Sequence, residues 1–85
     1  MTVSVYSIEK VLFRGDAVAV NCNTQAGEIT ILSHHRPIIS ILAKGTVKIT
    51  DGAGREHWIP VRSGFLEVNS QDQAMLLVEE GHADA

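Results

Sequence analysis

Histidines and a single cysteine are the side chains of this chain best suited to bind a metal or to act in catalysis. His34 and His35 are adjacent, so their imidazoles point to opposite faces of an extended backbone. Cys22 and His57 lie elsewhere in the sequence and provide no chelating pair at short spacing. We therefore expect no metal site.

Nucleophilic catalysis would need a different arrangement of residues. The chain has no nucleophile elbow, no glycine-rich phosphate loop and no paired carboxylates at a catalytic spacing, and Gly52-Ala53-Gly54 precedes no expected helix. We therefore expect a protein that is not an enzyme and needs no cofactor. A histidine-dependent hydrolase is an alternative, which requires His34, His35 or His57 to share a cleft with a nucleophile.

The charge and the apolar pattern limit the possible partners. The seven basic residues are scattered and the formal net charge is −3, which argues against nucleic acid or an anionic membrane surface as a partner. The lone Cys22 fits an intracellular protein. The chain has no signal peptide pattern, and no stretch approaches the roughly 18 apolar residues of a membrane span. Any membrane association is expected to come through a partner protein.

The elements that would position these residues are predicted to be strands. Apolar residues make up 45% of the chain and aromatic residues 5%, which favours a core of Val, Ile, Leu and Ala between closely facing sheets. Most segments alternate with period two, and turn residues recur about every ten positions. Asp51-Gly52 predicts a primed turn between the strands around Lys48 and Trp58. We predict one all-β sandwich domain over residues 1–85, with a frayed tail at 80–85.

Two segments depart from simple alternation. Ile38–Ala43 and Ala74–Val78 are apolar on both faces, which fits strands that are covered on both sides or that lie against a second subunit. Trp58 is either a core ring or part of an exposed partner patch, and both readings stay open. Pro60 favours an edge strand, because proline cannot donate to a ladder.

An ordered set of residues runs through nearly the whole chain, from residue 3 to residue 79. It consists of Val5 and Glu9 before Leu12-Phe13-Arg14-Gly15, the run from Gly27-Glu28-Ile29-Thr30-Ile31-Leu32 through Ser33-His34-His35-Arg36-Pro37, Gly45 at the head of a strand, and Ser63-Gly64-Phe65-Leu66-Glu67-Val68. In this order and spacing the chain resembles the epsilon subunit of F-type ATP synthase, which is called delta in mitochondria.

The resemblance implies a fold and a role. It implies a ten-stranded flattened β-sandwich of two antiparallel sheets, without catalytic activity, in the rotating central stalk. In that family the domain binds the gamma subunit and the ring of c subunits, and it helps to transmit ion-driven rotation to the catalytic head. The implied location is cytoplasmic, at the inner face of the cell membrane through the complex. We expect the isolated domain to be a monomer that does not insert into the membrane itself.

The resemblance also suggests contact residues. It directs the turn that bears Glu28 and the loop that bears His35 toward the c ring, so we expect a ring contact at Glu28, His35 and Arg36 on one tip. A carboxylate on a turn is a good acceptor for basic and amide groups. For the gamma contact we expect the two-faced apolar strands. The predicted residues there are Ile38, Ile39, Leu42, Leu76 and Val78.

Some features differ from the family pattern. His34 and Arg36 stand where the family has small residues, which makes this loop bulkier and more basic. The family's C-terminal helical hairpin has no counterpart after Gly81, so we expect neither an inhibitory arm nor an ATP site of that kind. The alternative function is a stand-alone module that binds a small ligand or a carbohydrate. It would need a concave site with aromatic platforms, and the chain contains only one Trp, one Tyr and two Phe.

Overall fold

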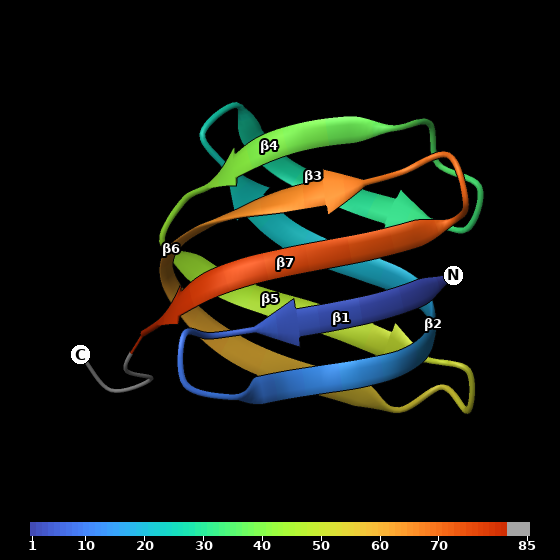
Figure 1. The fold of residues 1–85 in the computed structure, drawn as a ribbon, viewed down its shortest axis with the longest axis horizontal. Coiled ribbons are helices and arrows are strands. Elements are labelled where there is room, and N and C mark those ends of the chain that lie inside the picture. The colour runs from blue at the N-terminus through green and yellow to red at the C-terminus, as the bar shows by residue number, and fades with distance from the viewer. Residues whose placement is uncertain (82–85) are drawn as a thin grey trace.

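The chain folds into β-strands in the computed structural model, which describes residues 1–81 (Figure 1). The strands are β1 (Thr2–Tyr6), β2 (Val11–Thr24), β3 (Gly27–Leu32), β4 (Ile38–Leu42), β5 (Gly45–Asp51), β6 (Glu56–Val68) and β7 (Gln73–Glu80). Residues 1–81 form no helix that is long and apolar enough to cross a membrane. The predicted all-β sandwich is confirmed, with seven strands in the described residues in place of the expected ten.

The lower number of strands has a physical reason, because β2 and β6 each pass from one layer of the sandwich to the other. β2 pairs first with β1 and then with β3 and β5. β6 pairs first with β5 and then with β4 and β7. Register shifts between Ala17 and Ala19 and between Val61 and Ser63 mark the bends. Each of these long strands therefore counts once, although its two halves pair with different strands and could be counted separately.

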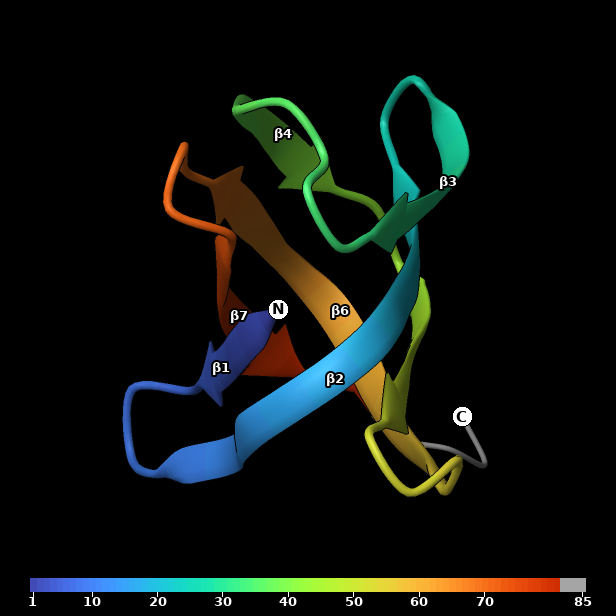
Figure 2. The same ribbon diagram turned by 90° about the vertical axis from the view of Figure 1, so that its right-hand side faces the viewer.

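The two layers share these long strands. The first layer contains β1, β7, β4, the first half of β2 and the second half of β6, and the second layer contains the remaining strands and halves. β4 meets β2 at the single pair of Thr24 and Leu42, and Figure 2 shows β3 and β4 apart at this corner. Alternate side chains fill the space between the layers. The largest fully buried ones are Ile31, Ile49, Leu66, Leu76, Val3, Val5, Val20 and Cys22.

The connections gather at two ends of the sandwich (Figure 1). The N-terminal end carries the N-terminus and the loops at 33–37, 52–55 and 69–72. The C-terminal end carries the loops at 7–10, 25–26 and 43–44. Glu80 still belongs to β7, and the Gly81 N–H donates to the Pro60 carbonyl at 3.0 Å, so the tail is ordered at least to Gly81. Residues 82–85 of the predicted frayed tail lie outside the described residues.

The hairpin between β5 and β6 connects the predicted strands, since Lys48 pairs with Trp58. The predicted primed turn at Asp51-Gly52 is wrong, because the positive φ lies at Gly54, with a value of 86°. The Asp51 Oδ1 accepts hydrogen bonds from the backbone N–H groups of Ala53 and Arg55, both at 2.9 Å. One carboxylate therefore organises a loop that is longer than a two-residue turn.

Candidate functional site

The closest pairing of a histidine with an acid lies beside this loop. His57 Nε2 is 2.9 Å from Asp51 Oδ2, and the Phe13 ring lies 4.9 Å from the His57 ring, centroid to centroid. The hydrogen bond from His57, followed by that from the Arg55 backbone, holds the pKa of Asp51 below its ordinary value. No hydroxyl or thiol within residues 1–81 is hydrogen-bonded to His57. The pair therefore closes the loop and activates no nucleophile.

The other residues considered for chemistry are dispersed. Cys22 is fully buried, and burial raises the pKa of its thiol to about 11, so the thiol stays protonated at neutral pH. The His35 Nδ1 lies 2.7 Å from the carbonyl oxygen of Arg36. Among the described residues, no group of three or more His, Cys, Asp or Glu side chains could hold a metal ion. Within residues 1–81, the residues considered for metal binding or catalysis therefore do not meet in one site.

Surface grooves are present but open. One of about 280 Å³ lies over β1, β6 and β7 and includes Tyr6, Arg14 and Glu67. One of about 420 Å³ lies beside Ile8, and one of about 450 Å³ lies beside Pro37. None of these three brings two aromatic rings together, which a carbohydrate platform would require.

Exposed apolar side chains cluster on part of the outer side of the first layer, around Glu67. Ile41 pairs with Phe65, which pairs with Leu77, and in the next row Ile39 and Met75 flank Glu67. The apolar strip defined here consists of Ile39, Ile41, Phe65, Met75 and Leu77, which are 75%, 57%, 41%, 41% and 40% exposed. These side chains project from β4, β6 and β7 on the face opposite the core. Within the described residues, the strip thus forms a cluster of exposed apolar side chains on three adjacent strands.

The strip corrects part of the predicted gamma contact. Leu42, Leu76 and Val78 are only 3%, 0% and 4% exposed, so their side chains belong to the core and are not available to a partner. Side chains alternate along a strand, and the neighbouring positions carry the outer face. Ile39 does lie on that face, and Ile38 is half-buried against the core.

Four members of the strip were not among the named contact residues, namely Ile41, Phe65, Met75 and Leu77. Ile41, Met75 and Leu77 lie in the two-faced apolar segments expected to make the contact, whereas Phe65 lies outside them. The signal was present in the sequence, because the runs around β4 and β7 are apolar on both faces. Such a run contains one core face and one exposed apolar face, and its periodicity does not say which is which. The pairing of both strands with β6 settles the orientation.

The outer side of the second layer mixes polar side chains with the exposed Trp58 and Leu32. Trp58 is 60% exposed, which rules out the core alternative for this ring. The Lys48 Nζ lies 5.5 Å from the centroid of the Trp58 ring and 3.5 Å from Glu56 Oε2. Asn21 Nδ2 donates to Thr30 Oγ1 at 2.8 Å. The polar groups of this face are therefore paired with one another.

The residues predicted for the ring contact lie far apart. Glu28 stands at the start of β3, paired with Asn23, whereas His35 and Arg36 follow the end of the strand beyond Leu32. A six-residue strand is about 20 Å long. Figure 1 shows the turn before β3 and the loop after it at opposite ends of the sandwich. The prediction of a single tip is wrong, because the strand separates the two contacts.

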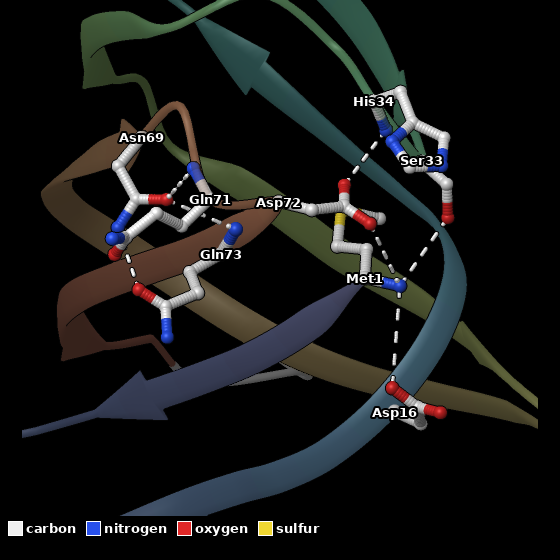
Figure 3. A network of polar contacts seen from close by, with 8 residues as sticks. All are labelled: Met1, Asp16, Ser33, His34, Asn69, Gln71, Asp72 and Gln73. Atoms are coloured by element: carbon white, nitrogen blue, oxygen red, sulfur yellow. Dashed lines mark hydrogen bonds and ion pairs between the residues drawn. The ribbon is translucent and has the colours of Figure 1, made fainter.

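A network of polar contacts holds the loop that carries His35 (Figure 3). The His34 N–H donates to Asp72 Oδ1 at 2.7 Å. The N-terminal ammonium of Met1 lies 3.4 Å from Asp72 Oδ2 and 3.3 Å from Ser33 Oγ. The bond from the His34 backbone, followed by the positive charge of the N-terminus, holds the pKa of Asp72 below its ordinary value. Sequence reasoning missed Asp72, which is 38 positions from His34.

Comparisons with known proteins agree with this architecture. Residues 1–83 match the family model described as the β-sandwich domain of the ATP synthase delta/epsilon chain. The ATP synthase epsilon chain of Dichelobacter nodosus is 37% identical over 78 residues, which cover 92% of this chain and 54% of the relative. That of Bordetella petrii is 44% identical over 68 residues, which cover 80% of this chain and 48% of the relative. The chain thus spans about half the length of these relatives.

Solved structures share the fold at low sequence identity. A chain of the Euglena gracilis mitochondrial ATP synthase, in a structure described as OSCP/F1/c-ring, matches with a TM-score of 0.83 and 18% identity over 89% of this chain and 48% of that one. A chain of the Tetrahymena thermophila central stalk and c ring matches with a TM-score of 0.80 and 15% identity over 94% of this chain and 63% of that one. The resemblance inferred from the sequence is confirmed, and the chain belongs to the ATP synthase delta/epsilon family of β-sandwich domains.

Proposed function

We propose that this chain is the sandwich part of a non-catalytic subunit of the ATP synthase central stalk, which binds gamma and the c ring and helps to couple rotation to the catalytic head. Membership of the family supports this role, as does the likeness to chains in central-stalk and c-ring assemblies. Such a complex would hold the domain on the cytoplasmic side of the cell membrane without insertion. The observation that carries the proposal is the apolar strip.

The apolar strip is the proposed gamma surface. Contiguous exposed apolar side chains are typical of protein interfaces. Single exposed apolar residues are common on any surface, whereas the strip groups such residues on three adjacent strands. The opposite face pairs its polar groups internally, through Lys48, Glu56 and Asn21. Association through the strip would also cover Glu67, which Ile39 and Met75 flank.

The 33–37 loop borders this surface. The groove of about 450 Å³ is lined by Pro37 of the loop, by Ile39 of the strip and by Glu67, which lies between strip residues. His35 and Arg36 lie on the same loop, so we assign them to the rim of the gamma surface. This assignment replaces their expected place on the ring.

The ring contact is assigned to Glu28 alone. Its exposed side chain stands in the second residue of β3, next to the 25–26 turn, and Lys44 lies on the 43–44 loop. An exposed ion pair contributes only about 0–1 kcal/mol. The turn would therefore set the register of the domain on the ring more than its affinity.

Gamma binding tests the proposal, with wild-type chain and two exposed-residue variants compared by calorimetry. Ile41→Ser should weaken binding about 10–100-fold, the range for an apolar interface residue. Leu32→Ser is the matched control, because Leu32 is also 57% exposed but lies on the outer side of the second layer. It should change the affinity less than about threefold.

Two results would contradict the proposal. If the folded wild-type chain does not bind a folded cognate gamma subunit, the assigned function fails. If Ile41→Ser and Leu32→Ser weaken binding equally, the strip is not the gamma surface.

A further inference from the structure

Two residues with side chains adopt left-handed backbone conformations, and they face each other. Among the described residues, His34 with φ of 67° and Asp72 with φ of 59° are the non-glycine residues with positive φ. This conformation is unfavourable for residues with a Cβ atom, so contacts must hold it. The contact is direct, because Asp72 Oδ1 accepts the N–H of His34 at 2.7 Å.

The same aspartate binds the beginning of the chain. Its Oδ2 lies 3.4 Å from the Met1 ammonium, and its carbonyl accepts the N–H of Thr2 at 3.1 Å. The ammonium also donates to Ser33 Oγ and lies 4.0 Å from Asp16 Oδ1 (Figure 3). Asp72 therefore joins the start of β1, the 33–37 loop and the 69–72 loop.

The 69–72 loop is shaped for this role. Asn69 Oδ1 accepts the N–H groups of Gln71 at 2.8 Å and Gln73 at 3.2 Å, and Asn69 Nδ2 donates to Gln73 Oε1 at 2.7 Å. These bonds close the loop on both sides of Asp72, as Figure 3 shows. The carboxylate is thus presented to the 33–37 loop from a preorganised turn.

We infer that Asp72 is a positioning residue, which holds the 33–37 loop in the shape that borders the apolar strip. The inference rests on the proposed function, because the loop forms the rim of the gamma surface through Pro37 and its groove with Ile39. The charged groups that face the carboxylate are the N-terminal ammonium, Asp16 on β2 and the His34 side chain. Without Asp72, His34 loses the bond that holds its conformation.

Hydrogen exchange in the isolated chain tests the positioning role independently of any partner. In Asp72→Ala, the His34 amide should exchange with solvent about 10–100-fold faster, the range for loss of a hydrogen bond to a charged group. Asp72→Asn should increase exchange less, because its amide oxygen can still accept the His34 N–H. Asp16→Ala is the control, since Asp16 has no bond to His34, and it should change this exchange less than about twofold.

Gamma binding then tests whether the loop shape matters. Asp72→Ala should weaken gamma binding about tenfold, which is a typical loss of affinity when one contributing part of an interface is disturbed. Adding His34→Gly should recover part of the loss, because glycine adopts a φ near 67° at little cost. The melting temperature of each variant separates this effect from a global change in stability, since His34→Gly also relieves backbone strain.

The outcomes separate the inference from the proposed function. Unchanged exchange at His34 in Asp72→Ala overturns the positioning role, whether or not gamma binds. Faster exchange with unchanged gamma affinity shows that the loop is not part of the surface, which also overturns the inference but leaves the strip in place. Absence of gamma binding by the wild-type chain overturns the proposed function, while the exchange result still decides the role of Asp72 in the free chain.

Discussion

Gly64 lies where β6 bends between the layers, and replacing it with alanine should disrupt the packing of β6 on β7. Its φ is 152°, and it pairs with Val78. An added Cβ would lie 2.3 Å from the Leu77 carbonyl oxygen and 2.9 Å from the Val78 Cα. Both are backbone atoms, so β7 must shift to relieve the clash.

The expected loss combines two costs. Overpacking costs about 1–3 kcal/mol, and forcing an alanine into an unfavourable φ costs about 1–3 kcal/mol. We take about 3 kcal/mol as the expected total, a large part of the roughly 5–15 kcal/mol that keeps a domain folded. At about 4–8 °C per kcal/mol for a domain of this size, the melting temperature should fall by about 12–24 °C.

Thermal unfolding followed by circular dichroism measures this loss, and two glycines serve as controls. Gly27 has φ of 122° with nothing within 4 Å of an added Cβ, so Gly27→Ala reports the backbone cost alone. Gly52 has neither a positive φ nor a close atom, and Gly52→Ala should stay within about 0.5 kcal/mol of wild type. If Gly64→Ala and Gly27→Ala have the same melting temperature, the clash between β6 and β7 is refuted.

Two further predictions concern titratable groups. Cys22 should resist a thiol reagent at neutral pH in the native chain and react fully in denaturant, because burial raises its pKa to about 11. Rapid labelling of the native chain would contradict the burial of this thiol. The pKa of Asp51 is lowered in the folded state from 3.8, so its stabilising contribution is full above pH 3.8 and is lost as the pH falls through the folded value. Urea unfolding of Asp51→Asn should therefore show a weaker loss of stability below pH 3.8, and a loss equal to that of wild type would contradict the pairing with His57.

Much of the fold follows from periodicity alone. Val47 and Ile49 alternate with polar residues in the sequence, and both are buried in the structure. The number of strands does not follow in the same way. The bends near Val18 and Arg62 interrupt the pattern of β2 and β6 without ending the pairing, because each strand changes partners while its backbone stays extended.

The candidate site was less predictable, because its parts depend on tertiary pairing. For β7, the sequence cannot tell Leu76 from Leu77, and only the pairing with β6 shows that Leu76 is core and Leu77 is surface. Glu28 and His35 are close in sequence but are separated by the length of β3. The bond from His34 to Asp72 joins loops that no local motif connects.

The geometry explains how one small domain could serve two partners at once. The apolar strip lies on β4, β6 and β7, whereas Glu28 lies at the start of β3 beside the 25–26 turn, so a partner on the strip does not cover the turn. Asp72 acts at the other end, beside the rim of the strip. Since Asp72 and Glu28 share no contact, a change in the 33–37 loop should alter the gamma surface and leave the ring contact unaffected. Under the proposed function, separate sites on a face and at an end would let the domain contact gamma and the c ring at the same time.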